Sequence, residues 1–169
     1  RGIHLSFVVG LIFLVFSAGK TRTAAARPSS LLAPFGIGIL DWALAIAAVT
    51  GCDFIRVNVL SGVAATDQGV IEGRAAELLR ERARFFGATW KGPLLFADAH
   101  VKHARSLSSD DLPSAIEDTA KRAGADAVIV TGSGTGKAAA LSDVEVASRT
   151  ARSLGVPLYL GSGVSSENL

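Results

Sequence analysis

The sequence predicts an α/β protein built around a parallel β-sheet. From Leu31 onward, short β-rich runs alternate with stretches of helical periodicity, and a glycine follows each helical stretch. Strands that alternate with helices of this length are typical of βαβ units, whose strands run parallel. The expected strands are residues 35–40, 54–60, 94–99, 127–131 and 157–160, and the expected helices are residues 42–49, 69–86, 113–123 and 143–153.

Sequence signals mark the ends of these helices. Asp111, shortly before Pro113, predicts an N-cap followed by a proline in the first turn, where a missing N–H is tolerated. Ser142 and Glu145 form a capping-box pattern at the start of the last helix. The glycines expected in the left-handed conformation that ends a helix are Gly51, Gly87, Gly124 and Gly155.

Length and composition favour one globular domain and argue against several function classes. Of the 169 residues, 49% are hydrophobic, and 18 glycines outnumber 5 prolines, which argues against disorder. The net charge is +2 and no dense cluster of Lys and Arg occurs, so no nucleic-acid partner is expected. Cys52 is the single cysteine, which excludes an intramolecular disulfide and a cysteine-based zinc site. No cofactor is expected.

The first thirty residues differ from the rest. Residues 3–18 are apolar and carry no formal charge, and residues 21–30 have the composition of a linker. The apolar run is shorter than the roughly 20 residues that span a bilayer. It suits a signal, anchor or transit sequence, or alternatively a buried strand or helix. We expect residues 1–30 to lie outside the fold and residues 31–169 to form it.

Side-chain polarity favours a (β/α) barrel over an open doubly wound sheet. Along residues 54–59 and 94–100, one face is apolar and the other becomes polar toward the carboxyl end. Central strands of an open sheet face helices on both sides and are apolar throughout. In a barrel the outer face packs against helices and the inward residues reach the mouth, where the chemistry takes place. The loops after these strands are therefore candidate functional loops.

The first candidate group belongs to the strand expected at residues 54–60. Arg56 and Asn58 lie two positions apart on one face, and burial of an unpaired arginine would be costly, so both are ligand-binding candidates. The loop that follows adds Asp67, Gln68 and Glu72 to these candidates. The alternative is a solvated loop in which Asp67 caps the next helix.

The second group is the run DAHVKH at residues 98–103. Period-two geometry places Asp98, His100 and Lys102 on one side, where an acid, an imidazole and an amine suit proton transfer or phosphate contact. Together with His103, these residues are the catalytic candidates. Simple exposure is the alternative for Lys102 and His103. An Asp–His pair is also compatible with a divalent metal, although two ligands are a weak signal.

Two glycine-rich loops follow the last two expected strands. The run TGSGTGK at residues 131–137 lacks the P-loop pattern, because Thr131 stands at the first glycine position and Ala138 at the hydroxyl position. Both loops still offer backbone N–H groups to an anion. The ligand-binding candidates are Thr131 and Gly132, and the phosphate-binding candidates are Gly161, Ser162 and Gly163. Two such loops on successive strands predict a phosphorylated ligand.

Four spaced motifs resemble the BtpA family, which includes SgcQ-like members. They are FIRVNVLSGVAATDQGVIE at 54–72, FADAHVKHA at 96–104, ADAVIVTGSGTG at 125–136 and LGSGVSSEN at 160–168. The resemblance covers about residue 35 to the end and implies a TIM barrel of the ribulose-phosphate-binding kind, linked to photosystem I biogenesis. It also implies that the polar candidates occupy signature positions and that residues 161–163 form a phosphate turn after the seventh strand.

Departures from the family pattern add further expectations. Nothing before Leu31 resembles the family's opening strands, and the family's last strand lies beyond Leu169, so about five of eight barrel strands are expected here. Exposed strand edges favour association, and a homo-oligomer is expected. We also expect this incomplete chain to be inactive by itself.

Three functions remain open from the sequence. The first is a BtpA-like barrel protein that binds a phosphorylated small molecule, in the cytoplasm or peripheral to a thylakoid membrane. The second is an isomerase, aldolase or lyase of a phosphorylated substrate, with His100 or Lys102 as acid or base. The third is a non-catalytic, membrane-associated assembly factor that uses residues 3–18 as an anchor.

Overall fold

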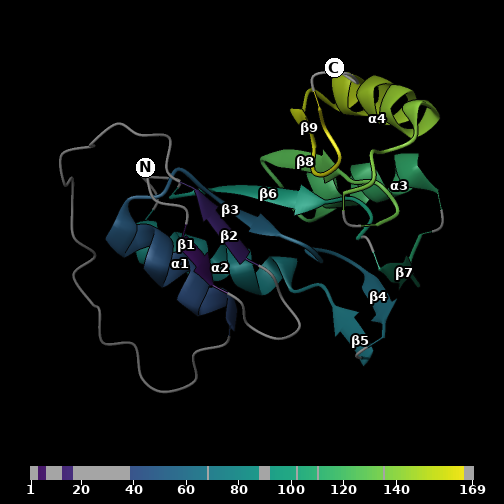
Figure 1. Ribbon diagram of the computed structural model, residues 1–169. Coiled ribbons are helices and arrows are strands. Elements are labelled where there is room, and N and C mark those ends of the chain that lie inside the picture. Colours follow the sequence, from purple (N-terminus) through teal and green to yellow (C-terminus); the bar gives the residue numbers. More distant parts are fainter. Residues whose placement is uncertain are drawn as a thin grey trace.

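The structure confirms an α/β protein with a parallel sheet and helices (Figure 1). The computed structural model describes residues 4–6, 13–16, 39–67, 69–87, 92–101, 103–109, 111–134 and 136–165. The elements are β1 (His4–Ser6), β2 (Phe13–Phe16), α1 (Ile39–Thr50), β3 (Phe54–Val57), β4 (Val63–Thr66), β5 (Gly69–Glu72), α2 (Ala75–Phe86), β6 (Leu94–Asp98), β7 (Ala104–Ser106), α3 (Leu112–Glu117), the π-helical turn η1 (Asp118–Arg122), β8 (Ala127–Val130), α4 (Leu141–Leu154) and β9 (Leu158–Leu160).

Four parallel strands form the centre of the larger sheet. Within the described residues this sheet has the order β1-β2-β3-β6-β8-β9, and β3, β6, β8 and β9 run parallel. Helix α2 lies between β3 and β6 in the chain, α3 with η1 between β6 and β8, and α4 between β8 and β9. All four residues of β8 are buried, as expected for a central parallel strand.

The strand register places all four helices on one face of the parallel strands. Ile55 is paired with Leu95, and Ala97 is paired with Val128, so these four side chains share a face. They belong to two buried clusters, of which one includes residues of α1 and α2 and the other residues of α3 and α4. Among the described elements, the opposite face carries no helix.

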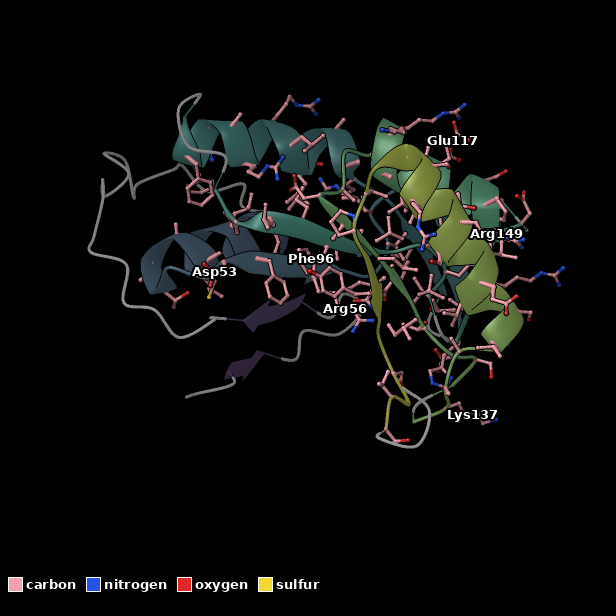
Figure 2. The ribbon with its side chains drawn as sticks, turned by 90° about the horizontal axis from the view of Figure 1, so that it is seen from above. Asp53, Arg56, Phe96, Glu117, Lys137 and Arg149 are labelled. Atoms are coloured by element: carbon pink, nitrogen blue, oxygen red, sulfur yellow. The ribbon has the colours of Figure 1, made fainter. Side chains whose placement is uncertain are left out.

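The opposite, helix-free face of the parallel strands is lined by aromatic rings. Phe96 of β6 stacks on Phe54 of β3, with ring centroids 4.3 Å apart, and on Tyr159 of β9, at 4.8 Å. The second stack spans β8, which lies between β6 and β9. Arg56 and Phe96, which are paired between β3 and β6, lie on this face (Figure 2).

The loops after β3 and β6 form the smaller sheet, which lies beyond the carboxyl ends of those strands (Figure 1). Strands β4 and β5 make an antiparallel hairpin, and β7 pairs antiparallel with β4. The helix expected over residues 69–86 is therefore wrong at its start, because residues 69–72 form β5 and α2 begins at Ala75. The β-branched Val70 and Ile71 favour the hairpin over a longer helix.

Two further expectations near helix starts are wrong. Ile39 and Leu40 belong to α1 and not to a strand, because the alanine-rich sequence that follows favours a helix; residues 35–38 lie outside the described residues. Ser142 and Glu145 do not form a capping box. The carbonyl of Ala140 already accepts from the N–H groups of Asp143 and Val144, so α4 begins at Leu141 and Ser142 lies inside its first turn.

Other expected helix boundaries are confirmed. The carboxylate of Asp111 accepts from the backbone N–H of Ser114 at 2.9 Å and caps α3. This hydrogen bond also lowers the pKa of Asp111. Positive φ angles between 66° and 70° occur at the four glycines that follow the helical stretches, which are Gly51, Gly87, Gly124 and Gly155. Gly155 has the expected left-handed conformation, whereas the ψ of −179° at Gly87 lies outside it.

Two short strands from the first thirty residues extend the larger sheet. Strand β1 pairs antiparallel with β2, and β2 pairs antiparallel with the free edge of β3. The division of the chain at residue 30 and the signal or anchor role of residues 3–18 stay predictions.

Candidate functional site

A buried ion pair joins the two strands that carry the predicted polar residues. Arg56 donates from Nη2 to both carboxylate oxygens of Asp98, at 2.8 and 3.0 Å, and from Nε to Oδ1 at 3.1 Å. The side chain of Asp98 has no exposed surface, and that of Arg56 is 13% exposed. Each buried charge is compensated by the other, as burial of ions requires.

Asn58 extends this cluster beyond the end of β3. Its Nδ2 donates to Oδ2 of Asp98 at 3.3 Å. Its Oδ1 is buried and has no hydrogen-bond partner. Asn58 is thus connected to the ion pair on one side and keeps an unused acceptor on the other.

His100 supplies a second unused polar atom, just past the end of β6. Its Nε2 is buried without a partner, and its backbone carbonyl accepts from Oγ1 of Thr131 at 3.4 Å. Across the described part of the chain, Asn58 Oδ1 and His100 Nε2 are the buried side-chain polar atoms that lack a hydrogen bond. Such atoms are rare in folded proteins, and a ligand or a bound water is the usual explanation.

A cavity of about 250 Å³ lies where the carboxyl ends of β3 and β6 meet the smaller sheet. Asn58, Asp98 and His100 all line it, as their shared period-two phase predicts. The loops and the smaller sheet add a mixed wall, which includes Ser61, Val63, Ala64, Ala104, Ser106 and Ser109. This volume lies just below the usual range of about 300–1,000 Å³ for ligand sites, so it suits only a small metabolite or part of one.

The described wall of this cavity presents neutral polar groups and one arginine. The charge of Asp98 is compensated by Arg56. Arg105 of β7 also lines the cavity and is exposed. Oγ of Ser106 accepts from the N–H groups of residues 108 and 109, which leaves its own proton available to a ligand.

The structure does not bring every predicted residue to this cavity. Asp67 is exposed at the turn between β4 and β5, and Glu72 is exposed at the end of β5. Asp67 does not cap α2 either, because Arg74 occupies that N-cap position. His103 is exposed, has a φ of 60° and does not line the cavity. Gln68 and Lys102 lie outside the described residues.

The two glycine loops pack against each other instead of lining the cavity. The backbone N–H of Gly136 donates to Oγ of Ser162 at 3.2 Å. A side chain at Gly163 would overlap the backbone of Ala138, and one at Gly132 would overlap the carbonyl of Lys137. Gly161 also lies close to the ion pair, because a Cβ at this position would be 3.0 Å from Nη2 of Arg56. The glycines are needed for this close backbone packing.

Sequence reasoning missed the three serines of the cavity wall. Ser61, Ser106 and Ser109 come from the two loops, and they meet because Ala64 of β4 pairs with Ser106 of β7. The pairing joins residues 42 positions apart, and short polar segments of this kind carry no periodic signal. The only available signal was that both loops follow strands with polar ends.

Among the described residues, no group of three or more His, Cys, Asp or Glu side chains is placed to hold a metal ion. Within the same residues, no helix combines the length and the apolar character needed to cross a membrane.

Fold and site together define an α/β protein whose parallel strands present a polar cluster and a cavity at their carboxyl ends. The sequence model of the BtpA family matches residues 15–169. The chain therefore belongs to the BtpA family, as its four motifs predicted. No solved structure matches the chain significantly.

Relatives of the chain occur in bacteria, archaea and animals. The chain is 45% identical over 143 residues to the Photosystem I biogenesis protein BtpA of Synechocystis, an alignment that covers 82% of this chain and 48% of the relative. It is 44% identical over 140 residues to an uncharacterised protein of Pyrococcus abyssi, covering 80% and 51%. It is 40% identical over 129 residues to an uncharacterised mitochondrial protein of Caenorhabditis elegans, covering 75% and 44%. The chain spans about half the length of these curated relatives.

Proposed function

We propose that this chain forms part of a (β/α) barrel of the ribulose-phosphate-binding kind. In such a barrel the helices cover the outer face of the parallel sheet and the inner face curves around a filled interior. The four described α-helices lie on one face, and Phe54, Phe96 and Tyr159 line the opposite face. Among the described strands β9 stands at the edge of the sheet, where a further parallel strand can pair.

The proposed activity is the binding of a phosphorylated small molecule at the carboxyl ends of these strands. One observation carries it: Asn58 and His100 come from two different strand ends, line one cavity, and each keep a buried polar atom without a partner. An unpaired buried polar atom costs about 1–3 kcal/mol. Polar groups of a bound ligand would recover this cost at both atoms.

The phosphate of this ligand is proposed to bind at Gly161, Ser162 and Gly163. These residues follow β9 at the same edge of the sheet as the cavity, because the carboxyl ends of parallel strands share one edge. Arg56 lies between the cavity and this turn, because it donates to Asp98 on one side and lies against Gly161 on the other. A ligand that extends from the cavity to this turn would pass its guanidinium.

A role in the biogenesis of photosystem I is proposed from the Synechocystis relative, whose name states that process. Relatives of similar identity occur in Pyrococcus abyssi and Caenorhabditis elegans, organisms without photosynthesis. This distribution favours a small-molecule function shared by the family, through which a photosynthetic member would support photosystem I.

An enzyme is the second candidate, and Nε2 of His100 is the observation that favours it. An imidazole nitrogen that faces a cavity without a protein partner is free to exchange a proton with a bound substrate. The reaction would belong to the isomerase, aldolase or lyase classes. Asp98 is less suited to proton transfer, because its carboxylate is held by Arg56 and Asn58.

Calorimetric titration with a panel of sugar phosphates tests the proposed binding. The 169-residue chain and the full-length Synechocystis relative are titrated in parallel, with His100→Ala as the site variant. Asp126→Asn is the matched control, because Asp126 also pairs with a largely buried arginine, Arg82, away from the cavity. We expect binding by the relative and a loss of at least about tenfold in affinity for the site variant, which corresponds to one buried hydrogen bond. Absence of binding by both proteins would contradict the proposal.

The proposed role in photosystem I biogenesis is tested by replacing the aligned segment of the Synechocystis protein with this chain. A hybrid gene that carries this chain in place of the aligned segment is introduced into a Synechocystis strain that lacks its own copy. Restored photosystem I content, measured by the absorbance change of its reaction centre, is expected for the hybrid and not for its His100→Ala variant. A hybrid that is stably produced but restores nothing would contradict the role.

A further inference from the structure

We propose that Arg56 and Asp98 are positioning residues that fix the side-chain amide of Asn58, so that Oδ1 faces the cavity as an acceptor for a hydroxyl group of the ligand. This inference rests on the proposed function and specifies which part of the ligand the cavity binds. It assigns Asp98 a different task from the catalytic one expected from the sequence.

The orientation of the Asn58 amide follows from chemistry. Asp98 faces a guanidinium at 2.8–3.1 Å, so its carboxylate is held in the ionised form, which accepts hydrogen bonds and donates none. The group of Asn58 that lies 3.3 Å from Oδ2 must then be the donor Nδ2 and not the amide oxygen. An amide rotated by 180° would place two acceptors against each other.

The orientation of Asp98 is set in turn by Arg56. A planar guanidinium that contacts both carboxylate oxygens fixes the plane of the carboxylate more firmly than a single bond would. Asp98 has no exposed side-chain surface, so a ligand in the cavity cannot reach its oxygens without displacing a neighbour. Arg56 and Asp98 therefore act on the ligand through Asn58.

The consequence for the ligand is a requirement for a donor inside the cavity. Asn58 presents its unpartnered acceptor Oδ1 there, and His100 adds an imidazole nitrogen that serves as donor or acceptor according to its tautomer. The hydroxyl of Ser106 adds a donor. This set of neutral donors and acceptors suits the hydroxyl-bearing part of a sugar or polyol, and the phosphate is placed by the proposed function at Gly161, Ser162 and Gly163.

A double-mutant cycle tests whether Asp98 acts on the ligand through Asn58. Because the chain is expected to be inactive by itself, affinity for D-ribose 5-phosphate, which carries hydroxyls and a phosphate, is measured by NMR titration on the Synechocystis hybrid that carries this chain. The wild type, Asn58→Ala, Asp98→Asn and the double variant are compared, and inorganic phosphate is the second probe. Each single variant is expected to weaken ribose 5-phosphate binding by about tenfold, and Asn58→Ala is expected to change the affinity for inorganic phosphate much less. The double variant should be no weaker than Asn58→Ala, because Asp98 acts through Asn58. A double variant whose loss of affinity equals the product of the two single losses would overturn the inference.

Two further measurements separate this inference from the proposed function and from loss of fold. Asp126→Asn weakens another Arg–Asp pair and should leave ribose 5-phosphate binding at the wild-type level. A loss equal to that of Asp98→Asn would reduce the role of Asp98 to stability.

Hydrogen exchange of the Asn58 side-chain amide, measured without ligand, should be slow in the wild type. Fast exchange there overturns the positioning role, whereas slow exchange together with no ribose 5-phosphate binding contradicts only the proposed function.

Discussion

Arg56 on β3 holds both carboxylate oxygens of Asp98 on β6, and this pair lies at the junction of the parallel sheet with the cavity. The two residues are 42 positions apart in the chain. Their charges cancel inside the protein, so neither is available to a ligand as a free charge. The pair instead determines how the neighbouring polar side chains are arranged.

Loss of this pair should destabilise the fold strongly. Asp98→Ala leaves the guanidinium of Arg56 largely buried without its counter-ion, and the free energy of unfolding should fall by about 3 kcal/mol or more. Urea denaturation followed by circular dichroism measures this change. The control is Glu81→Ala, which breaks the more exposed Arg84–Glu81 pair and should cost less than about 1 kcal/mol. Equal losses for both variants would show that the buried pair contributes no more than a surface pair.

Gly161→Ala should destabilise the end of β9. The added Cβ would lie 2.6 Å from Cγ2 of Thr131 and 2.8 Å from Cγ2 of Ile129, so these side chains must move. Overpacking of this kind typically costs about 1–3 kcal/mol in unfolding free energy. In the control Gly134→Ala, the new Cβ meets its nearest atom at an ordinary 3.5 Å, and a change within about 0.5 kcal/mol is expected. Thermal unfolding of the two variants compares them directly, and a stable Gly161→Ala would contradict the packing.

The Asp111 cap should make the first turn of α3 sensitive to acid. The backbone N–H of Ser114, which donates to the carboxylate, holds the pKa of Asp111 below its ordinary value of 3.8. A carboxyl whose pKa is lower in the folded state contributes stability above its unfolded pKa, and this contribution is lost as the pH falls through the folded pKa. NMR titration of the Asp111 carboxyl carbon should give a midpoint below 3.8.

Two variants check the cause of this shift. Asp111→Asn keeps a capping side chain but cannot titrate, so protection of the Ser114 amide should no longer change in this acid range. Ser114→Ala retains the backbone N–H and should preserve most of the shift. A midpoint at or above 3.8 in the wild type would show that the cap does not form in solution.

The two histidines of the loop after β6 should differ in their effect on ligand binding. His100 lines the cavity with an unpartnered Nε2, whereas His103 is exposed and does not line it. His100→Ala should weaken binding of D-ribose 5-phosphate by about tenfold, and His103→Ala by much less. NMR titration of both variants decides the matter, and a dominant loss in His103→Ala would restore the catalytic role that the sequence predicted for it.

Local patterns were sufficient for the class of the fold and for part of the site. Apolar runs of four to seven residues bounded by glycine-terminated helices predict parallel strands, and the structure has them at β3, β6, β8 and β9. The period-two phase of Asn58, Asp98 and His100 predicts a shared cavity, which they line. The family followed from the spacing of four motifs. Each of these conclusions depends on neighbouring residues along one segment of chain, and that information is present in the sequence.

The tertiary structure alone decided which of the polar candidates work together. The Arg56–Asp98 bond, the β4–β7 pairing and the packing of Gly163 on Ala138 join segments that are distant in the chain. No local period encodes such contacts, because they depend on which strands become neighbours and on how the sheet curves. The local pattern of the sequence determined only that charged and polar side chains occur at the ends of the strands. Only the folded chain decided that Asp98 is neutralised by Arg56 while Asn58 and His100 keep their polar atoms free toward the cavity.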